Sequence, residues 1–199
     1  MPTRMAEQLL TAEEFAQMPE SRGAELVRGR VVWPGAAEEP VNSWKHGSMV
    51  ARLSAILLDF AIPRRLGQVY TGDPGMIIGR DPDTARGPDV AFVAAARVPQ
   101  VPAEGFSPVV ADLVGEVVSP SDTAADVEAK VFEFLEAGVR LVWVVNPMGH
   151  RITEYRGAAQ IRVLGIRDML EGHVVLPGFR YPVQDVFDVE KSPRYPAEQ

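Results

Sequence analysis

The sequence predicts an α+β protein (α/β in the broad sense) in which a mixed β-sheet is flanked by helices. Short apolar segments of strand length follow one another along the chain, punctuated by glycine and proline. Two longer segments, residues 46–62 and 123–137, have apolar residues at helical spacing instead. The predicted order is helix, strands, helix, strand and further strands. That order lacks the regular strand–helix alternation of a doubly wound fold.

The N-terminal part of the chain is predicted to form a short helix, a hairpin and a long helix. Thr11 and Glu14 have the spacing of a capping box, and Pro19 ends the short helix that they begin. The segment AELVRGRVVWPG alternates around Arg28-Gly29, as in a tight hairpin. Residues 46–62 carry apolar side chains at the spacing of one helix face: Met49, Val50, Leu53, Ile56, Leu57 and Phe60.

The rest of the chain is predicted to form the sheet and its second helix. Strands are expected around GQVYTG, GMIIG and DVAFV, with the central strand over residues 109–118. Residues 119–122 offer several N-caps for a helix from about 123 to 137, and Gly138 is placed to end it. RLVWVVNP is a second apolar strand, RITEYR and AQIRVLG continue as a meander, and LPGFRYPVQDVF is a turn with a short strand or helix.

Length, composition and charge limit the class of protein. The 199 residues suit a single domain, with its core over about 11–187 and a loose tail over 189–199. The absence of cysteine excludes disulfides, thiolate metal sites and cysteine nucleophiles. No membrane span or secretory signal is visible, so we expect a cytoplasmic protein. The net charge of −7 argues against nucleic-acid binding through the overall field, but it is compatible with a local basic groove.

Three acids are predicted to lie in or beside strands: Glu25, Asp89 and Glu116. Glu116 is the most informative, because the central strand around it is apolar. A lone ionised carboxylate in a dry interior is so costly that it normally finds a cation or takes up a proton. Two carboxylates that converge from neighbouring strands form an oxygen-lined pocket, which is the environment that Mg²⁺ or Mn²⁺ prefers.

Lys130 is one of only three lysines among 20 basic residues, and it falls within the apolar stripe of the second helix. It stands three residues after Val127 and four before Phe134. Lys130 lies about 12 Å from the start of its helix at ~1.5 Å per residue. Glu116 lies about 13 Å back from Pro120 at ~3.3 Å per residue. A helix that runs back along its strand therefore brings the two side chains to the same level of the sheet.

Each of these residues also has an ordinary structural interpretation. Lys130 can pair with Asp126 on the helix surface while its stem covers apolar groups. His46 is expected to face solvent at the start of the long helix. Glu116 can instead lie at a strand end and face water. Glu25 can have a structural role beside the hairpin, and Asp89 can be a turn residue. Only the combination of the acids with the lysine favours a functional site.

Several segments occur in the order seen in a large bacterial family: ELVRGRVV, KHGSMVARL, GPDVAFV, DLVGEVVSPSD, AGVRLVWVVNP and LPGFRYPV. From about Thr11 to Phe187 the chain resembles the family of "putative restriction endonucleases", which belongs to the PD-(D/E)xK nuclease superfamily. The resemblance implies a restriction-endonuclease-like core, a Mg²⁺ or Mn²⁺ site, DNA as the substrate and a homodimer.

The resemblance also implies a role for each residue of the site. Asp89 and Glu116 match the acids of the motif and are expected to hold the metal. The motif lysine would stand two residues after the glutamate, where this chain has Val118, so Lys130 is interpreted as the displaced lysine. The further expected ligands are the backbone carbonyl of Val117 and the carboxylate of Glu25. The expected phosphate contacts are Arg28, Arg30, Lys45 and Arg52.

The sequence therefore predicts a metal-dependent endonuclease that hydrolyses DNA phosphodiester bonds. A bound metal polarises the scissile phosphate and lowers the pKa of a water molecule. Lys130 is expected to orient that water or to stabilise charge on the phosphate. The alternative is an inactive module that keeps the nuclease fold to bind DNA or a protein partner, because a fold match does not establish cleavage. A third interpretation is a metal-dependent hydrolase of another phosphate ester.

Overall fold

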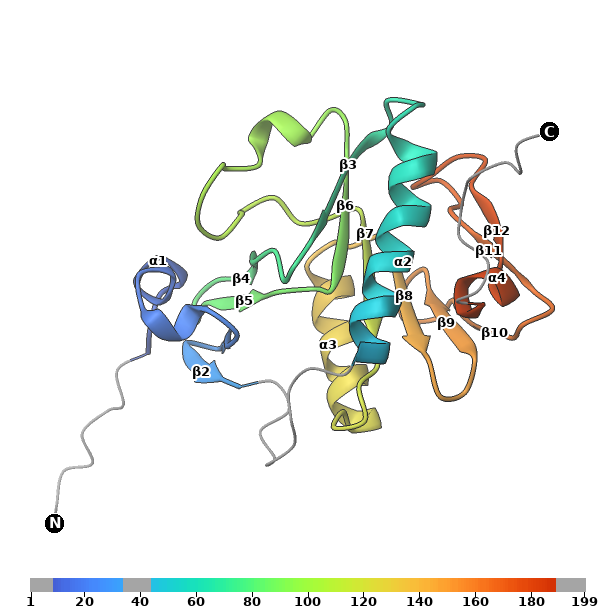
Figure 1. Ribbon diagram of the computed structural model, residues 1–199. Helices are drawn as coiled ribbons and strands as arrows, with labels where there is room; N and C mark the ends of the chain where they lie inside the picture. Colours follow the sequence, from blue (N-terminus) through green and yellow to red (C-terminus); the bar gives the residue numbers. More distant parts are fainter. Residues whose placement is uncertain (1–8, 34–43, 189–199) are drawn as a thin grey trace, which may run out of the picture.

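The computed structural model describes residues 9–33 and 44–188 (Figure 1). The predicted loose tail, residues 189–199, lies outside them. Short 3₁₀ turns occupy Pro19–Ser21 and Val98–Gln100. The helices are α1 (Ala12–Ala16), α2 (Trp44–Ala61), α3 (Ala124–Glu136) and α4 (Val183–Phe187). The strands are β1 (Glu25–Val27), β2 (Arg30–Val32), β3 (Gly67–Thr71), β4 (Met76–Gly79), β5 (Thr84–Arg86), β6 (Val90–Ala94), β7 (Leu113–Val117), β8 (Leu141–Asn146), β9 (Arg151–Tyr155), β10 (Ile161–Leu164), β11 (Met169–Glu171) and β12 (Arg180–Pro182).

A six-stranded sheet in the order β10-β9-β8-β7-β6-β3 forms the centre of the fold. Strands β7 and β8 are parallel, and the other neighbours are antiparallel. Helix α3 connects β7 to β8, because a parallel pair needs a long crossover. The predicted class, a mixed sheet flanked by helices, is confirmed. A four-stranded sheet β2-β1-β5-β4 and the pair β11-β12 complete the described strands.

Helices α2 and α3 cover opposite faces of the six-stranded sheet (Figure 1). Side chains alternate between the two faces along β7. Leu113 and Val117 join the core under α2, and Val114 joins the core under α3. Glu116 falls in the same alternate set as Val114, so the pleat directs its carboxylate toward α3 and away from α2.

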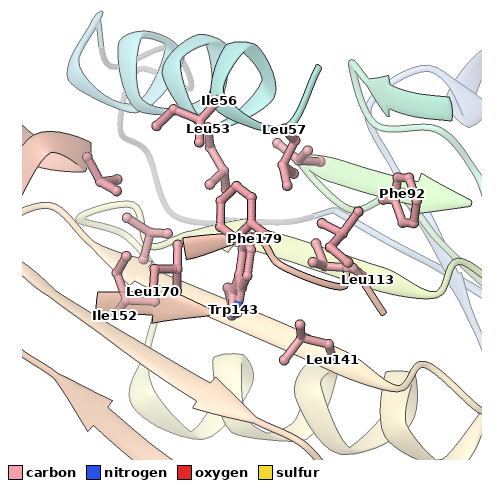
Figure 2. Close-up of a cluster of buried hydrophobic side chains, with 14 of the residues drawn as sticks. Leu53, Ile56, Leu57, Phe92, Leu113, Leu141, Trp143, Ile152, Leu170 and Phe179 are labelled. Carbon is pink, nitrogen blue, oxygen red and sulfur yellow. The ribbon is translucent and has the colours of Figure 1, made fainter. Parts of the chain in front are cut away.

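The core under α2 is built from large side chains of the sheet, of α2 and of the C-terminal segment, as Figure 2 shows. Trp143 is fully buried on β8, and its ring centroid lies 5.6 Å from that of Phe179. Gly115 allows α2 to approach β7, since a Cβ there would lie 2.7 Å from Leu53 Cδ2. This close packing holds the middle of α2 against the middle of β7.

Several local predictions are confirmed. Thr11 and Glu14 form both halves of the capping box at α1. The β1–β2 hairpin turns at Arg28 and Gly29, which have φ angles of 50° and 74°. Thr123 caps α3 by accepting a hydrogen bond from the backbone of Asp126. No helix in the described ranges is long and apolar enough to cross a membrane.

Other boundaries differ from the prediction. The central strand begins at Leu113 rather than at residue 109, because the Asp112 carboxylate accepts a hydrogen bond from the Ala94 N–H and ion-pairs with Arg97 and Arg140. The three-residue strands β5 and β11 were not predicted, since neither segment is long enough to display a two-residue period. The prediction of one mixed sheet therefore omitted the smaller four-stranded and two-stranded sheets.

Candidate active site

Lys130 on α3 contacts two carboxylates at once, the buried one of Glu25 and the partly buried one of Glu116. Its Nζ lies 3.1 Å from Glu116 Oε2 and 3.2 Å from Glu25 Oε1, and it donates a hydrogen bond to the Gly87 carbonyl oxygen at 3.2 Å. The side chains of Lys130, Glu116 and Glu25 are 20%, 14% and 9% exposed. The interpretation of Lys130 as a surface partner of Asp126 is wrong, because Asp126 is bonded to the cap residue Thr123 instead.

The sequence places these groups by simple rules of packing. Val131 and Phe134 are fully buried on α3, so the helix turns Lys130 toward the sheet with them. The pleat of β7 points Glu116 at the same helix. Lys130 and Glu116 thus meet at the level that the strand and helix rises predict.

Asp89 is attached to the end of β7 by its side chain. It immediately precedes β6, in which Val90 pairs with Gly115. Asp89 Oδ2 accepts a hydrogen bond from the Val117 N–H at 2.7 Å. The Asp89 backbone carbonyl accepts one from Thr71 Oγ1 at 2.9 Å. Asp89 therefore lies beside Glu116, and its negative charge contributes to the shifted pKa of that residue.

Burial and charge set the protonation of the three contacting groups. Burial raises the pKa of Glu116 to about 8, opposed by Lys130 and reinforced by Asp89. Burial disfavours the charge on Glu25, but Lys130 and Arg86 outweigh it and hold the pKa of Glu25 below its usual value. Burial also disfavours the charge on Lys130, yet the acids Glu116 and Glu25 raise its pKa. At neutral pH the lysine is a cation, Glu25 is its anion, and Glu116 takes up a proton unless another cation compensates it.

Arg86 and Glu133 extend the charged network behind Glu25. Arg86 Nη1 lies 2.6 Å from Glu25 Oε2, and Arg86 Nη2 lies 2.7 Å from Glu133 Oε2. The Gly87 N–H donates to Glu25 Oε1 at 3.2 Å. Sequence reasoning missed both charged residues. Arg86 belongs to the short strand β5, and Glu133 is one of several acids on α3, so neither has a local pattern that reveals the contact.

His46 was also missed as a part of the site. The sequence predicted that it faces solvent, whereas its Nε2 lies 3.3 Å from Asp89 Oδ2. The hydrogen bond to Asp89 raises the pKa of His46, although burial acts in the opposite direction. Asp73 is a further acid near Asp89, and burial together with that neighbouring charge raises its pKa. Only tertiary packing brings these residues to the site.

The donor atoms fit a hard divalent cation that keeps several water ligands. No group of three or more His, Asp or Glu side chains in the described ranges forms a ready-made metal cluster. Mg²⁺, however, is commonly held by one or two carboxylates plus water and phosphate oxygens. Glu116 Oε1 is buried without a hydrogen-bond partner, which is the kind of oxygen that a cation satisfies. Both oxygens of Glu25 are already engaged by Arg86, Gly87 and Lys130.

The four expected phosphate contacts lie on two elements. Arg28 and Arg30 are exposed on the β1–β2 hairpin. Lys45 is exposed in the first turn of α2, next to His46. Arg52 is buried, and its Nε donates to the backbone carbonyl of Asp185 at 2.8 Å. The structure thus gives Arg52 a bond between α2 and α4.

The chain is similar to proteins described as nucleases. The family model Uma2, "Putative restriction endonuclease", matches residues 12–184. A crystal structure described as a putative nuclease belonging to DUF820, from Anabaena variabilis ATCC 29413, superposes with a TM-score of 0.75 at 17% sequence identity. The match covers 89% of this chain and 97% of that one. No curated protein matches the chain. At that identity the superposition shows a shared fold.

Proposed function

The chain belongs to the Uma2 family of putative restriction endonucleases, and from this premise we propose that it is a Mg²⁺- or Mn²⁺-dependent endonuclease that hydrolyses DNA phosphodiester bonds. One observation carries the proposal. A largely buried lysine ammonium lies 3.1 Å from the largely buried carboxylate of Glu116, with a second acid, Asp89, fixed beside it by the Val117 N–H. Ordinary stabilising ion pairs are seldom buried so deeply, and strongly shifted groups cluster at functional sites.

Asp89 and Glu116 would hold the metal, with the Val117 carbonyl as a further ligand expected from the family resemblance. Glu25, the other ligand expected from the resemblance, could bind the metal only by giving up one of its contacts with Arg86, Gly87 and Lys130. Such an ion, when bound, polarises the scissile phosphate and makes a water molecule more acidic. The Val117 N–H and His46 both contact Asp89 Oδ2. These contacts fix the direction of that carboxylate, as supporting hydrogen bonds commonly do around metal ligands.

Lys130 would act as a fixed positive charge. The neighbouring acids raise its pKa, so it stays protonated at any ordinary pH and cannot serve as a base. Its ammonium can donate hydrogen bonds to a phosphate oxygen or to the attacking water. Glu25 fixes the position of the lysine through one carboxylate oxygen. Arg86 in turn fixes Glu25, because it lies 2.6 Å from the oxygen that Lys130 does not contact. The arrangement therefore positions a cation where negative charge would develop.

The test is incubation of the purified protein with supercoiled plasmid in Mg²⁺, Mn²⁺ or a chelator. We expect nicking or cutting only with a divalent metal, and a loss of about 10²-fold or more in Glu116→Gln and Lys130→Ala. Glu136→Gln, which changes an exposed acid on the same helix, should cut like the wild type. If the wild type binds DNA or a protein partner but cuts with no metal, the chain is the non-catalytic module.

A further inference from the structure

An open cavity of about 360 Å³ lies between the first turns of α2 and the turn from β8 to β9. The α2 residues that line it are spaced three and four apart, so they share one face of the helix. The β8–β9 turn forms the wall opposite α2. Asn146 stabilises this turn, because its side-chain oxygen accepts hydrogen bonds from the backbone N–H groups of Met148 and Gly149. The lining residues are Lys45, Ser48, Met49, Pro147, His150 and Phe187.

This cavity adjoins the proposed active site. Lys45 lines the cavity, and the next residue, His46, contacts Asp89 at 3.3 Å. Val117 pairs with Val145 in the parallel β7–β8 ladder, so both strands end at one edge of the sheet. The chain therefore passes directly from β8 into the cavity wall at the edge where Glu116 and Asp89 lie. Ligands commonly bind at the carboxyl edge of parallel strands.

The walls combine flat apolar surface with a few polar groups. The rings of His150 and Phe187 lie with centroids 5.3 Å apart and planes tilted by 35°. Met49, which also lines the cavity, is buried. Among the described residues that line the cavity, Lys45 supplies an ammonium group, and its Nζ lies 3.7 Å from Met148 Sδ. An apolar pocket with a few polar groups is typical of a site for a small flat ligand.

Two large apolar side chains are exposed beside this cavity. Trp44 is 96% exposed, one helical turn before Ser48 on the side of α2 that lines the cavity. Met148 is exposed on the facing turn. Exposed aromatic side chains next to positive charge are the usual means by which proteins bind unpaired bases.

We propose that this cavity receives one unpaired nucleobase of the substrate strand beside the scissile phosphate. Trp44 stacks on that base or on its neighbour, and Lys45 contacts the adjoining phosphate. The inference rests on the proposed nuclease function and adds a substrate class, a strand with an unstacked base at the cutting position. Paired duplex DNA presents no free base face to the cavity, so the protein binds single-stranded or locally opened DNA more tightly.

The experiment measures fluorescence anisotropy of a labelled single-stranded oligonucleotide in chelator, with the matching duplex as a comparison. A set of oligonucleotides, each with one abasic position, keeps the phosphates and removes one base at a time. We expect tighter binding to the single strand and a loss of about 5- to 100-fold at one or two abasic positions. In Trp44→Ala the affinity falls and the dependence on those positions disappears. Trp33→Ala, which removes a tryptophan that is also exposed, binds like the wild type.

Other outcomes overturn the inference. If Trp44→Ala binds as tightly as the wild type with the same abasic profile, the cavity does not hold a base. If Trp44→Ala instead halves the mass in light scattering and leaves binding unchanged, the surface is a contact between two copies of the chain. If the wild type still cuts plasmid in either case, the proposed nuclease function stands and only the base-binding cavity is ruled out. A wild type that neither cuts nor binds any DNA contradicts both.

Discussion

Lys130 contacts two acids, Glu25 and Glu116, and we expect these contacts to contribute to stability. Lys130→Ala leaves Glu116 and Glu25 without their common cation, while Arg86 still contacts Glu25. Breaking a buried charge pair by removing one partner is strongly destabilising. We expect the variant to lose about 3 kcal/mol in the free energy of unfolding at pH 7. Chemical denaturation measures this, and a variant as stable as the wild type would contradict the ion-pair network.

The raised pKa of Glu116 predicts that metal binding is coupled to the release of a proton. Its pKa is raised from 4.5 to about 8 by burial, so the folded protein holds a proton there that the unfolded chain releases above pH 4.5. Its contribution to stability is therefore greatest at low pH and falls as the pH rises from about 4.5 to 8. A cation that binds Glu116 must displace this proton.

We therefore expect the affinity for Mn²⁺ to rise with pH up to about 8, approaching about 10-fold per pH unit for one displaced proton. Titration calorimetry in buffers of different ionisation enthalpy should show close to one proton released per metal ion at pH 7. Glu116→Gln should bind metal weakly and lose the pH dependence. An affinity that stays constant between pH 6 and 8 would show that Glu116 is not protonated in the folded protein.

Sequence reasoning located part of the charged cluster around Lys130, because some of its residues violate a local pattern. Glu116 is an acid in an apolar strand, and Lys130 is a rare lysine on an apolar helix stripe. His46, Arg86 and Asp73 violate no local pattern. Their positions in the site depend on how α2, β5 and the loop before β4 pack against β7, which no window of the sequence encodes.

At the scale of elements, α2 connects the proposed site to the C-terminal segment. Arg52 Nε bonds the Asp185 carbonyl of α4, and Phe187 on the same short helix lines the cavity beside Lys45. The position of Arg52 thus indicates a structural role, while Lys45 remains a predicted phosphate contact.

Two substitutions on α2 separate these roles. Arg52→Met should lower the free energy of unfolding by about 1 to 2 kcal/mol, because it removes the charged hydrogen bond from buried Arg52 to the Asp185 carbonyl. It should leave the salt dependence of DNA binding unchanged. Lys45→Ala should leave stability unchanged and reduce the slope of log K against log salt by about 1. The reverse result for the two residues would mean that Arg52 reaches DNA and that its bond to α4 is dispensable.

The elements that sequence reasoning found and missed differ in length. Helix α2 and strand β8 display several periods of their pattern, so their existence and type are predictable. Strands β5 and β11 have three residues each and exist because neighbours offer them hydrogen bonds. Strand β5 ends in Arg86, which contacts Glu25. Because the strand was not predicted, the contribution of Arg86 to the charged cluster was not predicted either.

At the scale of the whole molecule, the homodimer stays a prediction, and the edge strand β10 is a candidate for its interface. In the part of the chain that the structure describes, β10 has a neighbouring strand on one side only, and it exposes Ile161 and Val163. An exposed apolar edge strand is a ready template for pairing with a second chain. We expect light scattering to give about twice 21.7 kDa for the wild type and a single-chain mass for Val163→Lys. A wild type that is already monomeric would rule out the dimer.

The proposed site draws its charges from distant parts of the chain, and this determines when the site can exist. Glu25 lies on β1, Asp89 directly before β6, Glu116 on β7 and Lys130 on α3. A chain emerging from the ribosome cannot bring them together until α3 has been made and the sheet has closed around β7. A copy that ends before α3 would thus lack Lys130 and could not form the proposed site. In refolding experiments, Mn²⁺ binding should appear in the same kinetic phase as the burial of Trp143, and metal binding in an earlier phase would show that a partial site forms first.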